Sequence, residues 1–324
     1  MEENIEQRVD LTLFSEKIQE LKDQIASVIV GQEQTVDLVL AAILANGHVL
    51  IEGVPGVAKT LLARLTARLI DADFSRIQFT PDLMPSDVLG TTVFNMKTND
   101  FDFHQGPIFA DIVLVDEINR APAKTQAALF EVMEERQISI DGTTHKMGEL
   151  YPILATQNPV EQEGTYKLPE AQLDRFLMKI TMDYPSLEEE VDILERHHTN
   201  ASLIKLDDIK PAITKEELLS LRAFMNQVFV DRTLLQYIAL IVQQTRTSKA
   251  VYLGASPRAS VAMLQASKAY ALLQGRDFVT PEDIKFVAPY VLQHRLILTA
   301  EAEMEGYSPV KVTQRLIDKV EVPK

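Results

Sequence analysis

A short glycine-containing segment, residues 53–61, has the residue types that bind the phosphates of a nucleotide. It follows an apolar run that predicts a strand and precedes a run that predicts a helix. In such a loop, glycines let backbone N–H groups wrap the phosphates, a lysine reaches the β- and γ-phosphates, and a threonine hydroxyl ligates Mg²⁺. The residues expected to form this cradle are Gly53, Val54, Pro55, Gly56, Val57, Ala58, Lys59, Thr60 and Leu61.

One position of this segment departs from the strict phosphate-loop pattern. Ala58 stands where the pattern has glycine, and we expect ordinary helical dihedrals there, which alanine tolerates. The alternative interpretation of the segment is a Gly/Pro turn before an amphipathic helix whose Lys59 is merely exposed. A second motif further along the chain favours the phosphate loop.

That second motif is an acidic pair at the end of the apolar run 112–116. Asp116 closes the run and Glu117 follows it directly. A carboxylate at the C-terminal end of a parallel strand beside a phosphate loop can hold Mg²⁺, which predicts this role for Asp116. Glu117 is then suited to orient and deprotonate an attacking water, because a metal-bound carboxylate is a poor base. The alternative is an acidic strand end that caps the next helix.

The elements that must position these residues indicate an α/β fold with a mostly parallel sheet. Continuous apolar runs, which suit strands buried on both faces, fall at residues 48–52, 74–79, 112–116, 151–156 and 176–180. Helical patterns lie between them near residues 33–46, 59–70 and 122–135. Two hairpins are expected as insertions, at about 92–104 and 137–147.

The strand pattern stops after Tyr184-Pro185, and apolar residues then recur at helical spacing. Thr280 followed by Pro281 predicts a helix start, with threonine as the cap and proline in the first turn. We therefore expect two domains, an α/β core over residues 1–185 and a smaller all-helical domain over residues 186–324.

The composition narrows the functional classes. The 324 residues carry 32 basic and 47 acidic side chains, a net charge of −15, which argues against a broad nucleic-acid-binding surface. No apolar run reaches the ~18 residues of a membrane span, so no membrane insertion is expected. The chain has no cysteine, its six histidines lack metal-ligand spacing, and its first residues do not resemble a signal peptide. A cytoplasmic location fits these observations.

Four motifs, in order along the chain, resemble the MoxR branch of the AAA+ ATPases. They are the loop 53–60, the acidic strand end 116–122, the segment 155–159 (Ala-Thr-Gln-Asn-Pro) and residues 168–176. The resemblance implies an AAA+ P-loop core with a five-stranded parallel sheet of strand order 5-1-4-3-2 and a helical lid. It also implies a homo-oligomeric ring, usually a hexamer, with ATP and Mg²⁺ at the subunit junctions. Ala58 is usual in this branch, and the two hairpins match elements that face the central pore in relatives.

The resemblance assigns roles to residues outside the two motifs described first. Gly31 and Gln32 resemble the segment that lines the adenine pocket. Asn158 matches the sensor-1 residue, whose amide can hold the attacking water and report on the γ-phosphate. The alternative for Asn158 is a plain Asn-Pro turn.

Three arginines complete the expected site. Arg175 matches the arginine finger that reaches a neighbour's γ-phosphate, with a salt bridge to Asp174 or Glu170 as the alternative. Arg258 falls in the first turn of an expected helix, where a cation opposes the helix dipole, and it matches the sensor-2 arginine. For Arg120, a role across the subunit boundary and an ordinary surface position are equally open.

The resemblance implies an ATP-hydrolysing ring motor with a chaperone-like role in the remodelling, maturation or metal insertion of client proteins. Relatives often work with a partner that carries a von Willebrand factor A domain. A nucleic-acid translocase is one alternative, because related ring helicases carry the same two hairpins; the net charge and the few basic residues at the hairpin tips (Lys97, His145 and Lys146) argue against it. A nucleotide-binding scaffold that does not hydrolyse is the other alternative.

Overall fold

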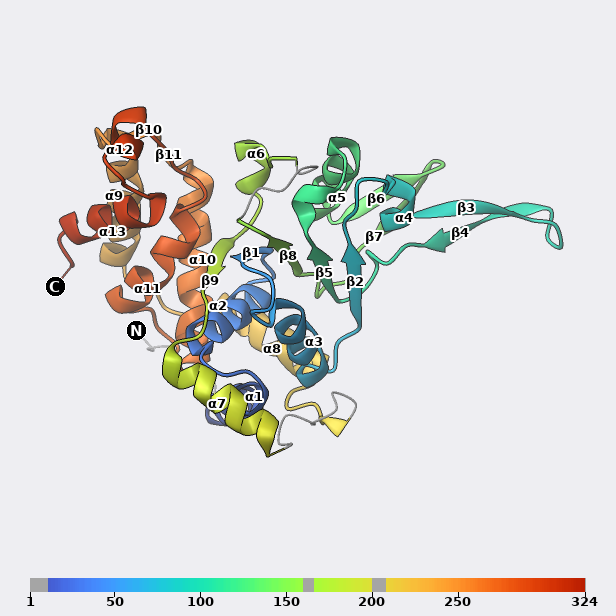
Figure 1. Ribbon diagram of the computed structural model, residues 1–324, viewed down its shortest axis with the longest axis horizontal. Coiled ribbons are helices and arrows are strands. Elements are labelled where there is room, and N and C mark those ends of the chain that lie inside the picture. The colour runs from blue at the N-terminus through green and yellow to red at the C-terminus, as the bar shows by residue number, and fades with distance from the viewer. Residues whose placement is uncertain (1–10, 160–165, 200–207, 324) are drawn as a thin grey trace, which may run out of the picture.

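A five-stranded parallel sheet forms the centre of the protein (Figure 1). The computed structural model describes residues 11–159, 166–199 and 208–323. The strands lie in the order β2-β5-β8-β1-β9, which confirms the predicted order 5-1-4-3-2 when the core strands alone are numbered. Their bounds are β1 (Val49–Gly53), β2 (Phe74–Gln78), β5 (Ile112–Asp116), β8 (Ile153–Gln157) and β9 (Met178–Met182).

Apolar side chains fill both faces of this sheet, as its continuous apolar strands predict. Because side chains alternate along a strand, Val49 and Ile51 pack on one face while Leu50 packs on the other. Each such fully buried aliphatic side chain contributes about 1.5–3 kcal/mol. The helices that contribute to the first face are α1 (Thr12–Val28), α2 (Glu33–Leu44) and α3 (Lys59–Leu69), and those on the second are α4 (Pro85–Leu89) and α5 (Ala123–Glu135).

Two antiparallel hairpins extend from the core. β3 (Gly90–Asn95) pairs with β4 (Asp100–Gln105), and β6 (Gln137–Ile140) pairs with β7 (Thr143–Lys146). Figure 1 shows the first hairpin projecting well beyond the sheet, at the end of the molecule away from the C-terminal helices.

The base of the first hairpin and the contact between the two hairpins each depend on specific residues. Gly90 has φ +101°, and a Cβ there would lie 2.2 Å from the carbonyl oxygen of His104, so glycine is required. Thr92 Oγ1 donates to Asp141 Oδ2 at 2.5 Å, which ties the two hairpins together. The projecting hairpin is thereby supported by its shorter neighbour.

The chain after β9 is mostly helical. Thr280 N–H donates to the Asp283 carboxylate at 2.7 Å and Asp283 N–H donates to Thr280 Oγ1 at 3.4 Å, which confirms the predicted helix start as a capping box. The domain boundary at residue 185 stays a prediction. In the described ranges, no helix is long and apolar enough to cross a membrane. The elements are α7 (Leu187–His198), α8 (Lys215–Met225), α9 (Arg232–Thr247), β10 (Val251–Leu253), α10 (Pro257–Leu273), α11 (Pro281–Leu292), β11 (Ile297–Leu298), α12 (Ala300–Met304) and α13 (Pro309–Lys319).

A buried arginine joins the end of α11 to the start of β9. Arg295 Nε donates to the Asp174 carboxylate at 2.6 Å, and its side chain is only 4% exposed. Its two Nη atoms donate to the backbone carbonyls of Asp174, Phe176, Leu177 and Val291. Each N–H direction of the guanidinium therefore has an acceptor, and the sheet edge and the helical region are fixed to one another.

Candidate active site

The phosphate loop connects β1 to α3 and lines a cavity of about 370 Å³, here called the phosphate-loop cavity. Gly56 has φ +91°, and a Cβ placed there would meet nothing within 4 Å, so the loop is open toward the cavity. Lys59 Nζ donates to the carbonyl oxygens of Gly53 and Val54. Burial lowers the pKa of Lys59, although Asp116 and other nearby carboxylates favour its charged form. The lining residues are Pro55, Gly56, Ala58, Lys59, Thr60, Leu61, Asp116, Glu117, Thr156 and Asn158.

The expectation of helical dihedrals for Ala58 was wrong. Ala58 has φ 60° and ψ 22°, the left-handed region, and α3 begins only at the next residue, Lys59. The loop must reverse direction before the helix starts, and a left-handed residue makes that reversal. An alanine in this conformation costs roughly 1–2 kcal/mol, so the surrounding loop must hold it there.

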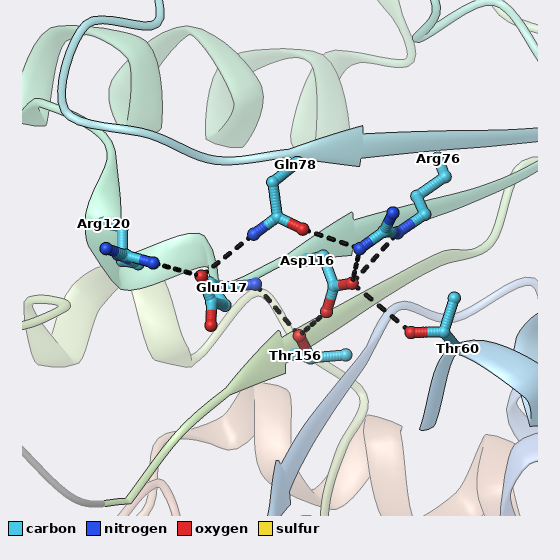
Figure 2. Close-up of polar contacts among 7 residues, drawn as sticks. All are labelled: Thr60, Arg76, Gln78, Asp116, Glu117, Arg120 and Thr156. Atoms are coloured by element: carbon cyan, nitrogen blue, oxygen red, sulfur yellow. Dashed lines mark hydrogen bonds and ion pairs between the residues drawn. The ribbon is translucent and has the colours of Figure 1, made fainter. Parts of the chain in front are cut away.

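Asp116 lies at the end of β5 and accepts hydrogen bonds from three side chains (Figure 2). Thr156 Oγ1 donates to Oδ1 at 2.5 Å, and Thr60 Oγ1 donates to Oδ2 at 3.3 Å. Arg76 donates to Oδ2 from Nε at 3.0 Å and from Nη2 at 2.7 Å. Burial by itself would raise the pKa of Asp116, but the hydrogen bonds and the Arg76 charge outweigh it and the pKa lies below its ordinary value.

Glu117 directly follows β5 and has three polar partners, two of which lie on neighbouring strands. It has φ 56° and ψ 52°, a left-handed conformation uncommon for a residue other than glycine. Its N–H donates to Thr156 Oγ1 at 3.0 Å. Its Oε2 accepts from Gln78 Nε2 at 2.9 Å and from Arg120 Nη1 at 2.8 Å. Left-handed residues of this kind cluster at functional sites, and this one turns the Glu117 carboxylate out of the strand direction.

The sequence did not predict a role for three of these residues, Arg76, Gln78 and Thr156. Arg76 and Gln78 stand at alternate positions of β2, so both lie on one face of that strand. Thr156 sits inside a motif that was recognised but was given no role of its own. For Thr156, a polar residue within the buried strand β8 was the available signal.

Two of the three predicted arginines line a second cavity of about 680 Å³, here called the arginine cavity, whose lining includes Glu134, Arg175 and Arg258. Arg175 Nη1 lies 3.9 Å from Glu134 and donates to the carbonyl oxygen of Phe130. Arg258, in the first turn of α10, lies 3.1 Å from Glu134. Among the described residues, Arg175 forms no salt bridge to Asp174 or Glu170, the alternative partners, and Asp174 pairs with Arg295. Neither Arg175 nor Arg258 is among the described residues that line the phosphate-loop cavity.

Of the remaining predicted site residues, one lines the phosphate-loop cavity and two do not. Asn158 lines the phosphate-loop cavity, directly after β8. Gly31 and Gln32 are not among the described residues that line it. Gln32 Oε1 accepts from Thr35 Oγ1 at 2.9 Å, and the Glu189 side chain lies directly against Gly31. Their predicted contact with adenine remains a prediction.

The residues present fit a magnesium nucleotide. Thr60 Oγ1 and Asp116 Oδ2 are two hard oxygen donors 3.3 Å apart, the type of ligand that Mg²⁺ prefers. The Lys59 ammonium and the N-terminus of α3 face the same cavity and supply positive charge for phosphates. The donor set therefore matches both parts of such a ligand.

Comparisons with known proteins agree with this geometry. Residues 48–178 match the ATPase family associated with various cellular activities (AAA), and residues 243–318 match the AAA lid domain. Protein YeaC of Bacillus subtilis is 48% identical over 304 residues, 93% of each chain. Chaperone MoxR1 of Mycobacterium tuberculosis is 44% identical over 310 residues, 93% of this chain and 81% of that one. A solved structure from Cytophaga hutchinsonii matches at TM-score 0.89 and 41% identity over 97% of each chain.

The similarity extends over nearly the whole chain, and the phosphate loop faces the acidic pair across one cavity. The chain therefore belongs to the MoxR family of AAA+ ATPases.

Proposed function

We propose that this protein hydrolyses ATP and uses the energy to remodel a client protein. The observation that carries the proposal is the grouping of Lys59, Thr60, Asp116 and Glu117 around one cavity, although the loop and the acidic pair are more than fifty residues apart. Phosphoryl transfer requires a phosphate cradle, oxygen ligands for a cation and a group that positions water. These four residues supply all three.

Each residue has a distinct role in the proposed reaction. The loop N–H groups and Lys59 bind the phosphates, and Thr60 and Asp116 would hold Mg²⁺, which neutralises phosphate charge when bound. Glu117 accepts a proton from water as the water oxygen bonds to the γ-phosphorus and the bond to the β-phosphate bridging oxygen breaks. The products are ADP and inorganic phosphate. Asn158 lines the same cavity, and in the proposed reaction its amide would orient the same water.

The proposed assembly is a homo-oligomeric ring, with a hexamer as the expected size. Arg175 and Arg258 line a different cavity from Lys59, and both lie near the single carboxylate of Glu134. In a ring, this surface would meet the phosphate-loop cavity of a neighbouring subunit, so that the two guanidinium groups stabilise charge on the γ-phosphate. A subunit junction would then form one complete site.

The proposed partner is a protein rather than a nucleic acid. The tip of the projecting hairpin exposes Phe94 (46%), Met96 (89%) and Phe101 (66%), and two aspartates, Asp100 and Asp102, flank them. Exposed apolar groups of this kind suit contact with polypeptide, whereas acidic groups repel phosphates. The relative named Chaperone MoxR1 favours the same role. Maturation or metal loading of the client, and a partner with a von Willebrand factor A domain, are finer parts of the proposal.

Substitution of the proposed base tests the hydrolysis step. Glu117→Gln should lower ATP turnover by at least about 100-fold, because the amide cannot accept the proton, while leaving binding of a fluorescent ATP analogue near the wild-type value. Glu131→Gln, an exposed residue of α5 with the same change in charge, is the matched control and should turn over normally. Unchanged turnover in Glu117→Gln, or no nucleotide binding by the wild type, would contradict the proposal.

A further inference from the structure

The guanidinium of Arg76 lies beside the Asp116 carboxylate, at the position that a bound cation would occupy. It belongs to β2, an edge strand of the sheet, which pairs with β5 in a register that sets Gln78 beside Asp116. Arg76 is two residues earlier on the same face, so its side chain reaches the carboxylate diagonally across the strands. Figure 2 shows both guanidinium contacts ending on one oxygen, Oδ2 of Asp116.

The hydrogen bonds to Asp116 leave little acceptor capacity for a metal ion. A carboxylate has about four lone-pair positions. One is used by Thr156 on Oδ1, and Oδ2 receives Thr60 and two N–H groups of Arg76. A divalent cation held between Thr60 and Asp116 would bind Oδ2 of Asp116, and this is the oxygen that Arg76 holds. An ion coordinated there and a guanidinium at 2.7 Å would also repel each other.

We propose that Arg76 is a positioning residue that competes with the divalent cation for Asp116, so that the guanidinium must leave Oδ2 before the cation is bound there. This inference rests on the metal role proposed above for Asp116. Arg76 has room to leave, because its side chain is 46% exposed, whereas that of Asp116 is 11% exposed. The carboxylate stays in place through Thr156 when Arg76 moves.

The same guanidinium also connects the cation site to the proposed base. Arg76 Nη2 donates to Gln78 Oε1 at 2.7 Å, and Gln78 Nε2 donates to Glu117 Oε2 at 2.9 Å. An amide held at its oxygen by Arg76 presents its N–H₂ to Glu117. Departure of Arg76 removes that constraint. Whether Asp116 holds Arg76 or a cation therefore affects how Glu117 is held, through the hydrogen bonds from Arg76 to Gln78 and from Gln78 to Glu117. With Arg76 in place, Asp116 is neutralised and Glu117 is held by Gln78.

The test measures how strongly a divalent cation enhances nucleotide binding. The dissociation constant of a fluorescent ADP analogue is measured with Mg²⁺ and with EDTA, and the ratio of the EDTA value to the Mg²⁺ value is compared among variants. In Arg76→Gln, an uncompensated Asp116 repels the nucleotide in EDTA and is free for Mg²⁺ when the ion is present. We therefore expect the ratio to rise about 3- to 30-fold, the size expected for loss of one charge-assisted hydrogen bond at a half-exposed site.

Three further proteins define the interpretation. Arg76→Lys keeps the charge and should give a ratio near the wild-type value. Arg64→Gln makes the same change at an exposed arginine of α3 and should leave the ratio unchanged. In the Asp116→Asn background, Arg76→Gln should no longer raise the ratio.

A ratio in Arg76→Gln that is equal to or below the wild-type ratio would overturn the inference. A purely structural role for Arg76 changes both dissociation constants together and leaves the ratio unmoved, and thermal unfolding in EDTA reports any loss of folded protein. Failure of the proposed function is seen separately, as a wild type that does not bind the ADP analogue in either condition.

Discussion

The phosphate-loop cavity and the arginine cavity differ in the charged side chains that line them. In the first, the Lys59 ammonium shares the space with two carboxylates, Asp116 and Glu117. In the second, two guanidinium groups lie near one carboxylate, Glu134, at 3.1 and 3.9 Å. The first cavity thus has the groups proposed to bind phosphates and activate water. The second has an excess of positive charge, because its described lining includes four arginines (Arg136, Arg175, Arg258 and Arg295) and two carboxylates (Glu134 and Asp174).

This difference is what the proposed ring requires, in which each chain would supply two separate parts of a reaction site. Charge that develops on a transferred phosphoryl group is best stabilised by fixed cations on the side away from the loop. Within the described residues, the arginines of the second cavity do not line the first. In the proposed ring, each part would act only together with the other part on a neighbouring copy of the chain.

The largest effect should come from separating and then recombining the two halves. Lys59→Ala and Arg175→Ala should each lower ATP turnover by about 10³-fold, the first through lost phosphate binding and the second through lost transition-state charge. An equal mixture of the two variants should recover about a quarter of wild-type turnover, because random rings place an intact loop beside an intact arginine at that fraction of junctions. The measurement is steady-state phosphate release after mixing.

Absence of recovery in the mixture would show that both residues act on the same nucleotide within one chain. Size-exclusion chromatography of each variant with nucleotide is the control, since recovery requires that both proteins still assemble. A recovery equal to the sum of the separate activities would contradict the split site equally well.

A smaller effect is expected at Arg258. Arg258→Ala should lower turnover by about 10- to 100-fold, because the second guanidinium adds to the charge supplied by Arg175. Binding of a fluorescent nucleotide to the dilute variant should be unchanged. Arg258→Lys should keep part of the activity, and Arg232→Ala, in α9, is the control. A weakened nucleotide affinity in the dilute Arg258→Ala protein would place this arginine at its own subunit's loop.

A separate effect concerns stability rather than turnover, and it arises at His48, a buried residue that lines the arginine cavity. His48 Nδ1 accepts from the Ile153 N–H at 3.0 Å, so the ring is neutral with its proton on Nε2, 3.1 Å from the Met133 carbonyl oxygen. Burial lowers the pKa of His48 from 6.5 to about 4. As the pH falls, the unfolded chain takes up the proton before the folded protein does. The contribution of His48 to the free energy of unfolding is therefore complete above about pH 6.5 and is lost as the pH falls toward 4, by roughly 3 kcal/mol in total.

Urea unfolding across this pH range checks the expectation at His48. The free energy of unfolding of His48→Gln should fall less steeply with decreasing pH than that of the wild type. His104→Gln, which changes an exposed histidine of β4, should follow the wild-type slope. Parallel slopes for the wild type and His48→Gln would contradict the assignment.

Much of the fold could be predicted from the sequence because burial and apolar composition agree. Strand β5 was predicted at its observed bounds, since it is continuously apolar and ends in charged residues. Strands β8 and β9 begin two residues later than predicted. Tyr151 and Phe176 are buried in connections rather than strands, and apolar character does not distinguish the two.

Parts of the site depended on information that is not local in the sequence. The identities of Lys59 and Glu117 revealed their chemistry, because few residue types can perform it. The contact of Arg76 with Asp116 joins residues forty positions apart, and only the pairing of β2 with β5 brings them together. The left-handed conformation of Ala58 is set by the path of the loop rather than by its residue type, which favours the opposite region.

The fully bonded guanidinium of Arg295 has a mechanical consequence. It grips Asp174, the residue immediately before Arg175, while its own backbone follows α11. A rotation of the C-terminal helices against the sheet would therefore pull on the segment that carries Arg175, since breaking the four hydrogen bonds from Arg295 to residues 174–177 at once is costly for a side chain that is 4% exposed. In the ring proposed above, Arg295 would thus transmit a movement of the C-terminal helices in one subunit to Arg175, and so to the phosphate bound by the next subunit.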